Sequence, residues 1–169
     1  QLNALGGLSK YLPVFLPMLA PTINSYTRLV KGAWAPTSST WGVDNRTAAI
    51  RVIPGSASSQ RIECRAGGAD GNPYLAGAAI LGAALLGIRE KLNPGDPIIG
   101  NAYEQEDSLS SDLKFPTSLG EASARFESSN QARDLFGSDF VDHFVMTRRW
   151  EVSEYHRHVN DWQHGRYFE

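Results

Sequence analysis

Residues 45–65 read NRTAAIRVIPGSASSQRIECR, and this stretch decides the predicted fold. β-branched residues gather toward its two ends, and Pro54-Gly55 followed by the serine-rich run 56–59 separates the two groups. β-branched residues favour strands, whereas Pro, Gly and Ser favour turns. The wider segment 37–65 therefore predicts two or three short antiparallel strands.

Helical patterns flank this strand region on both sides. Residues 2–20 repeat apolar side chains every three or four positions, but Pro13 and Pro17 interrupt the pattern, which predicts a kinked or broken helix. Asn72 is a good N-cap and Pro73 suits the first helical position, so a long helix is expected from there to about Leu92. The other expected elements are a short helical turn over 21–26, a surface excursion over 96–114, and helices over 118–128, 130–136 and 139–162.

These elements predict an α+β fold in which short antiparallel strands pack against several helices, as one domain over residues 1–169. A chain of this length with 41% hydrophobic residues can bury a sizeable core. The longest uncharged run, residues 71–88, is rich in Gly and Ala and predicts a buried helix rather than a membrane span. Cys64 is the single cysteine and no cleavable leader is recognised, so a cytoplasmic location is expected.

The net charge of −2 conceals an uneven distribution. Residues 28–65 contain six basic and two acidic side chains, for a net charge of +4, whereas residues 66–169 carry a net charge of −7. An anionic small molecule is therefore expected to bind the basic block. Nothing elsewhere in the sequence resembles a nucleic-acid-binding surface.

Arg61, Glu63 and Arg65 alternate along one expected strand. Alternate residues share a face of a strand, so these three point the same way while Ile62 and Cys64 point to the core. Two guanidinium groups beside a carboxylate can hold a phosphate or a carboxylate, with a divalent cation on the glutamate. The same spacing also fits a solvated ladder of ion pairs on the outer face of a sheet, and it leaves both interpretations open.

Five segments occur together in a characteristic order: NSYTRLV at 24–30, GAWAP at 32–36, NRTAAIRVIP at 45–54, RIECR at 61–65 and NPYLAGAA at 72–79. The set resembles the glutamine synthetase family. The resemblance extends over residues 1–169 and covers the C-terminal part of that family's catalytic domain, without the N-terminal β-grasp domain.

The resemblance implies an ATP-dependent ligase that phosphorylates the γ-carboxylate of glutamate and lets ammonia or a larger amine displace the phosphate. It also implies magnesium or manganese as the metal cofactor, glutamate and an amine as substrates, and a ring-shaped homo-oligomer. No membrane or nucleic-acid partner is implied.

Each matching side chain acquires a role through the resemblance. Arg28 and Arg65 would bind the amino-acid substrate, each by its own motif. Arg46 would face the transferred phosphoryl group, where positive charge stabilises the transition state, and so would contact both substrate and ATP. The remaining assignments are Arg51 and Arg61 on the ATP phosphates and Glu63 on the metal ion.

Trp34 departs from the family pattern. Glutamine-forming members have a glutamate at this place, which is thought to bind and deprotonate ammonium, and an indole can do neither. An indole can instead line an apolar or cation-π pocket for a larger amine, so the sequence looks closer to the γ-glutamyl-amine ligases. Simple packing of Trp34 within its loop is the other interpretation.

The family's other carboxylate ligands and its metal-binding histidine are expected upstream of this segment, so the 169-residue chain alone is expected to be inactive. A non-catalytic nucleotide-binding, phosphate-binding or assembly module is the alternative function. Tyr103 lies in the string NAY, similar in place to a tyrosine that is nucleotidylated in some bacterial members, but its surroundings differ and this regulation is not expected.

Overall fold

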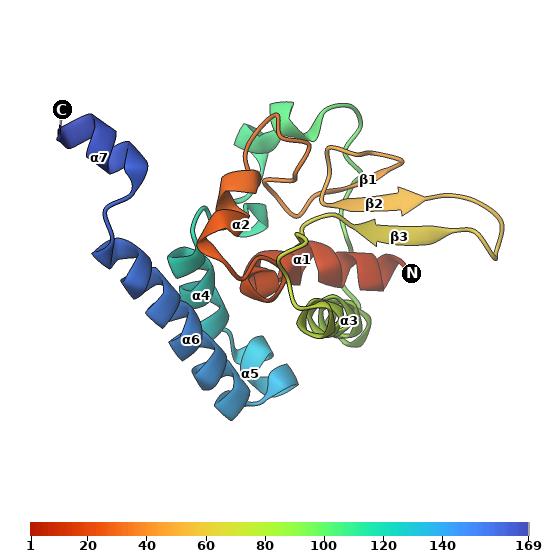
Figure 1. Cartoon of the computed structure of the whole chain (residues 1–169). Helices are drawn as coiled ribbons and strands as arrows, with labels where there is room; N and C mark the ends of the chain where they lie inside the picture. The colour runs from red at the N-terminus through yellow and green to blue at the C-terminus, as the bar shows by residue number, and fades with distance from the viewer. Residues whose placement is uncertain (169) are drawn as a thin grey trace.

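Helix α1, Leu2–Leu19, lies at the centre of the fold, with a small sheet on one side and helix α3, Pro73–Arg89, on another (Figure 1). The computed structural model describes residues 1–168. The other elements are α2 (Ile23–Arg28), β1 (Trp41–Val43), β2 (Ile50–Ile53), β3 (Arg61–Cys64), the 3₁₀ turns η1 (Ala102–Glu104), η2 (Glu106–Ser108) and η3 (Ser111–Leu113), and the helices α4 (Leu119–Glu127), α5 (Asn130–Phe136), α6 (Ser138–Arg157) and α7 (Asp161–Tyr167).

The sheet has the order β1-β2-β3, and the α+β class is confirmed. Strands β2 and β3 pair antiparallel, as the sequence predicts, and their register sets Arg51 opposite Glu63. The expectation that all strands are antiparallel is wrong for β1, which pairs parallel to β2 with Trp41 opposite Ile50.

The short connection between β1 and β2 explains the parallel pairing, because side chains fasten it to a distant segment. The Asn45 amide nitrogen donates to the carbonyls of Ile98 and Gly100, at 3.2 and 2.8 Å. The Asn45 amide oxygen accepts from both the backbone and the hydroxyl of Thr47. The chain thereby returns to the start of β1 within six residues.

Helix α1 is continuous from Leu2 to Leu19, so of the two predicted outcomes, a kinked or a broken helix, the break is wrong. Pro13 has no N–H to donate to the carbonyl of Ser9, which normally weakens a helix. The hydroxyl of Ser39 donates to that carbonyl instead, from the chain just before β1. A contact that is distant in the sequence thus compensates for the proline.

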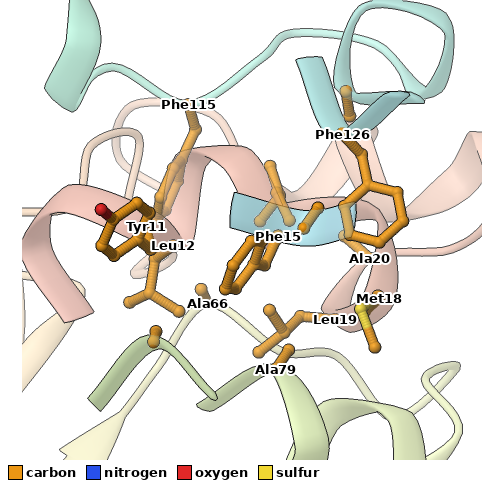
Figure 2. Packing of buried hydrophobic residues seen from close by; sticks show 14 of the residues in the cluster. Tyr11, Leu12, Phe15, Met18, Leu19, Ala20, Ala66, Ala79, Phe115 and Phe126 are labelled. Atoms are coloured by element: carbon orange, nitrogen blue, oxygen red, sulfur yellow. The ribbon is translucent and has the colours of Figure 1, made fainter. Parts of the chain in front are cut away.

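The core surrounds α1 and continues into the C-terminal helices (Figure 2). Phe15 on α1 packs against Phe126 on α4 and Phe136 on α5, with ring centroids 6.2 and 5.2 Å apart, in edge-on arrangements. On the other side, α1 meets α3 so closely that glycines are required at the contact. A Cβ atom at Gly87 would lie 2.1 Å from the carbonyl oxygen of Asn3.

The helix predicted over 139–162 is wrong in its C-terminal part, because α6 ends at Arg157 and α7 begins at Asp161 (Figure 1). Asn160 accepts from the backbone of Gln163, and the Gln163 side chain accepts from the backbone of Asn160. This reciprocal cap starts a new helix. Over residues 1–168, no helix combines the length and apolar character needed to cross a membrane.

Candidate functional site

Three charged side chains meet on one face of the β2–β3 pair. The antiparallel register sets Arg51 opposite Glu63, and one guanidinium nitrogen of Arg51 lies 3.2 Å from Glu63 Oε2. Arg65 follows β3 directly, and its Nη1 lies 3.1 Å from Glu63 Oε1. We call Arg51, Glu63 and Arg65 the basic cluster. Its carboxylate is held by one arginine at each oxygen.

Two loops extend the basic cluster. The Asp44 carboxylate, at the end of β1, accepts from the Nε of Arg51 at 3.0 Å and also forms an ion pair with its Nη2. On the other side, Arg65 Nη2 donates to the backbone carbonyl of Trp34 at 2.9 Å. The cluster therefore joins the sheet to the loop that contains Trp34.

Electrostatics keep the carboxylates of this region ionised. Partial burial alone would raise the pKa of Glu63, but the hydrogen bonds and charges of Arg65 and Arg51 outweigh it and hold the pKa below its usual value. The hydrogen bond from Arg51 likewise lowers the pKa of Asp44. Arg51 and Arg65 each meet an ionised partner at neutral pH, whereas Arg61, which the ion-pair interpretation also placed in the ladder, forms no ion pair within residues 1–168.

Arg46 and Arg61 are exposed at the edges of this region. Arg46 has no hydrogen bond or ion pair within residues 1–168, and Arg61 donates only to the carbonyl of Ser59, at 3.2 Å. Their charges remain available to an anion. The structure thus places Arg46 on the loop after β1 and Arg61 at the start of β3, both outside the ion-paired cluster.

Arg28 stands at the C-terminal end of α2 and reaches toward the chain after β3. Its Nη2 donates to the carbonyl of Ala66 at 2.7 Å, one residue beyond Arg65. Asp70 anchors α2 from the same loop by accepting from Ser25 and Thr22. The side chain of Arg28 is therefore held beside the cluster rather than within it.

Trp34 has a 68% exposed side chain and a left-handed backbone with φ of 55°. So exposed a side chain makes little packing contact with residues 1–168, and the amine-pocket interpretation of Trp34 stays a prediction. Ile62 is also misplaced by the sequence prediction. It is 38% exposed and lines an open groove with Leu5 and Val52 instead of entering the core.

The described residues fit an anion better than a metal ion. Guanidinium groups are suited to phosphate and carboxylate oxygens. The Nε of Arg65 is buried and has no hydrogen-bond partner among residues 1–168, so the cluster retains a donor for a further acceptor. In that part of the chain no three His, Cys, Asp or Glu side chains gather as metal ligands would. Glu63 alone does not make a cation site.

Sequence reasoning missed two contributors to this region. Asp44 pairs with Arg51 because the parallel β1 ends beside β2, which no local pattern indicates. The Tyr103 hydroxyl donates to the carbonyl of Ala35 at 2.8 Å, across 68 residues of sequence. The cross-strand pair of Arg51 and Glu63 could have been predicted from the sequence, since a hairpin centred on residues 54–60 sets these positions opposite each other.

Comparison with known proteins shows which family the chain resembles. Residues 1–167 match the family model described as the catalytic domain of glutamine synthetase. The chain is 48% identical to type-1 glutamine synthetase 2 of Dictyostelium discoideum, over 94% of the chain and 30% of that protein. It is 41% identical to glutamate–isopropylamine ligase of a Pseudomonas species, over 99% of the chain and 36% of that protein.

A solved structure supports the same relationship. The structure titled "GmaS/ADP complex-Conformation 1" superimposes with a TM-score of 0.85 at 31% identity, over 99% of this chain and 39% of that one. The chain spans about a third of the length of the curated relatives. With a matching sequence and a matching fold over nearly all of its residues, the chain belongs to the glutamine synthetase family.

Proposed function

We propose that a full-length protein containing this chain is an ATP-dependent ligase that joins the γ-carboxylate of glutamate to an amine. ATP would phosphorylate that carboxylate, and the amine nitrogen would attack the resulting acyl phosphate, form the amide bond and release phosphate. The observation that carries the proposal is the basic cluster beside an exposed Trp34, in a chain of this family.

Different arginines would bind different anionic groups of the substrates. Arg46, Arg51 and Arg61 would bind the phosphates of ATP, and Arg46 would also stabilise the charge of the transferred phosphoryl group. Arg28 and Arg65 would bind the carboxylates of glutamate. The exposure of Arg46 and Arg61 and the unpartnered Nε of Arg65 support these assignments, because each offers a donor that no described residue occupies.

Magnesium or manganese is proposed as the metal cofactor, with Glu63 as one ligand. A divalent cation would offset the charge of the ATP phosphates. Both oxygens of Glu63 are paired with arginines in this structure, and residues 1–168 supply no group of three ligands. The remaining ligands would therefore come from other parts of a full-length protein.

Trp34 supports an amine larger than ammonia. An exposed indole offers a flat apolar face that attracts an alkylammonium ion by hydrophobic and cation-π contact. The relative named glutamate–isopropylamine ligase agrees with this choice, while the relative named glutamine synthetase keeps ammonia as the competing acceptor. A homo-oligomeric ring and a cytoplasmic location complete the proposal, both by family resemblance.

The alternative is a binding or assembly module that retains nucleotide or phosphate without turnover. The observation that supports it is the ion pairing of Glu63, which occupies one guanidinium nitrogen of Arg51 and one of Arg65 without any substrate. Binding of ADP without release of phosphate from ATP would favour this module.

Phosphate release from ATP tests the proposal directly. We expect a full-length protein to release phosphate with glutamate plus isopropylamine faster than with glutamate plus ammonium, and not to do so without glutamate. A matched Trp34→Glu variant, which places a carboxylate at the same position, is expected to shift the preference toward ammonium. Equal or faster turnover of the unmodified protein with ammonium would overturn the role of Trp34.

A further inference from the structure

The loop that contains Trp34 is held at both of its ends by one short segment, residues 101–106. At one end, the Tyr103 hydroxyl donates to the carbonyl of Ala35 at 2.8 Å. At the other end, Lys31 Nζ lies 3.2 Å from Glu106 Oε2. We call residues 101–106 the strap. Its two contacts lie three residues apart in the strap and four apart in the loop.

The loop needs such contacts because its own conformation is unfavourable. Gly32 has φ of 83° and Trp34 has φ of 55°. A non-glycine residue in the left-handed region costs about 1 kcal/mol or more, so external contacts must stabilise it. The carbonyl of Trp34 is bound by Arg65, and the next carbonyl, that of Ala35, is bound by Tyr103.

The strap is itself fixed to the loop between β1 and β2. The backbone N–H of Ala102 donates to the hydroxyl of Thr47 at 2.9 Å, and the amide of Asn45 donates to the carbonyl of Gly100, the residue before the strap, at 2.8 Å. These contacts flank Arg46. The strap therefore connects the loop of Trp34 with the loop of Arg46. Within the strap, Tyr103 is the residue whose side chain donates a hydrogen bond to the loop of Trp34, at the carbonyl of Ala35.

We propose that Tyr103 is a positioning residue that sets amine selectivity by holding the loop of Trp34 in place beside Arg65. This inference rests on the proposed ligase function. Tyr103 acts through Trp34 and does not itself touch a substrate. Its hydroxyl fixes a carbonyl adjacent to Trp34, so its loss releases the indole while the ion pairs of Glu63 with Arg51 and Arg65 remain.

The chemistry of the phenol suits this role. Burial raises the pKa of Tyr103 above its ordinary value, although the nearby positive charge of Arg65 opposes the shift. The hydroxyl therefore stays protonated at neutral pH and can donate. Replacement by phenylalanine removes only the donor and leaves the ring, so the packing of the strap is retained.

The test compares Tyr103→Phe with the unmodified full-length protein. We expect the KM for isopropylamine to rise about five-fold, as expected for one lost neutral hydrogen bond. The KM for glutamate is expected to change less than about two-fold. Tyr74→Phe is the matched control, because Tyr74 is 86% exposed and its hydroxyl has no partner within residues 1–168.

A double-mutant cycle and hydrogen exchange separate positioning from general destabilisation. In a Trp34→Ala background, Tyr103→Phe is expected to have no further effect on the KM for amine, since its effect passes through Trp34. Amide exchange in residues 33–37 is expected to become faster in Tyr103→Phe and to remain unchanged in Tyr74→Phe. This exchange measurement does not need an active enzyme.

The outcomes distinguish the two proposals. If the unmodified protein does not ligate glutamate to amines, the proposed function fails, whatever exchange shows for the strap. If it does ligate them, either an unchanged KM for isopropylamine in Tyr103→Phe or an effect of equal size in the Trp34→Ala background overturns the role of Tyr103.

Discussion

At the scale of single residues, Asp70 shows how one carboxylate fixes a helix of the candidate site. It accepts from the hydroxyls of Ser25 and Thr22 at the start of α2, the helix that ends in Arg28. These bonds, led by the one from Ser25, lower the pKa of Asp70. We expect Asp70→Asn to reduce the free energy of unfolding at pH 7 by about 1 kcal/mol, as measured by urea denaturation.

The same pKa shift predicts the pH dependence. Because the folded-state pKa lies below the ordinary value of 3.8, the stabilisation is complete above that value and is lost as the pH falls through the folded-state pKa. The difference between the two proteins is therefore expected to shrink in acid. Asp96→Asn is the control, since Asp96 is exposed and has no hydrogen bond or ion pair among the residues that the structure describes. A difference that stays constant down to pH 3 would contradict the ionic contribution.

At the scale of elements, the contact between α1 and α3 depends on Gly7 and Gly87. A Cβ atom at Gly87 would lie 2.5 Å from the Cα of Gly7 and 2.1 Å from the carbonyl oxygen of Asn3. Neither neighbour is a flexible side chain, so the helices would have to separate. We expect Gly87→Ala to lower the free energy of unfolding by about 3 kcal/mol, measured by thermal or urea denaturation.

Gly77 offers a matched control in the same helix. A Cβ atom at Gly77 would have no neighbour within 4 Å, so Gly77→Ala adds only helix propensity. This substitution is expected to stabilise the protein by about 0.5–1 kcal/mol. Destabilisation of similar size in both variants would show that helix geometry, and not the contact with α1, accounts for the effect.

The predictions that succeeded at this scale depend on local chemistry. The Asn72 side chain caps α3 by accepting from the backbone of Tyr74, and Ser118 caps α4 by accepting from the backbone of Glu121. Such caps involve residues two or three positions apart, so a sequence shows them directly. The helix break at Asn160 has an equally local signal, the reciprocal cap with Gln163. The sequence prediction missed this cap because the apolar periodicity continues through it.

The predictions that failed depend on contacts distant in the sequence. The parallel pairing of β1 relies on Asn45 binding the carbonyls of residues 98 and 100, and the unbroken α1 relies on Ser39 binding the carbonyl of Ser9. The candidate site follows the same division. The spacing of β3 indicated the pairing of Glu63 with Arg65, whereas the bond from Tyr103 to Ala35 spans 68 residues and has no local pattern.

At the scale of the whole molecule, the uneven charge acquires a structural explanation. The basic segment 28–65 contributes β1, β2 and β3, and three of its arginines remain free of acidic partners within residues 1–168, namely Arg28, Arg46 and Arg61. The acidic remainder of the chain supplies the strap, which binds Lys31 through Glu106. The arginines that we propose to bind anions and the strap that supports the loop of Trp34 therefore come from oppositely charged segments.

The whole-molecule organisation also predicts what residues 1–169 do when produced alone. The arginines that we propose to bind phosphate and carboxylate groups are present, but residues 1–168 contain no group of three potential metal-ligating side chains. We expect this segment to show the circular dichroism of the seven α-helices described within residues 1–168, and to release no phosphate from ATP with glutamate and isopropylamine. A full-length protein assayed at the same concentration is the positive control.

Binding distinguishes an incomplete site from an unfolded segment in that experiment. A folded segment is expected to retain weak, salt-sensitive binding of ADP through Arg46 and Arg61, because exposed guanidinium groups attract phosphate and are screened by ions. Replacing both arginines with glutamine should abolish the binding without changing the circular dichroism. Turnover by the segment alone at a rate comparable with the full-length protein would show that residues 1–169 assemble the metal site by themselves, and it would overturn the division of ligands proposed for Glu63.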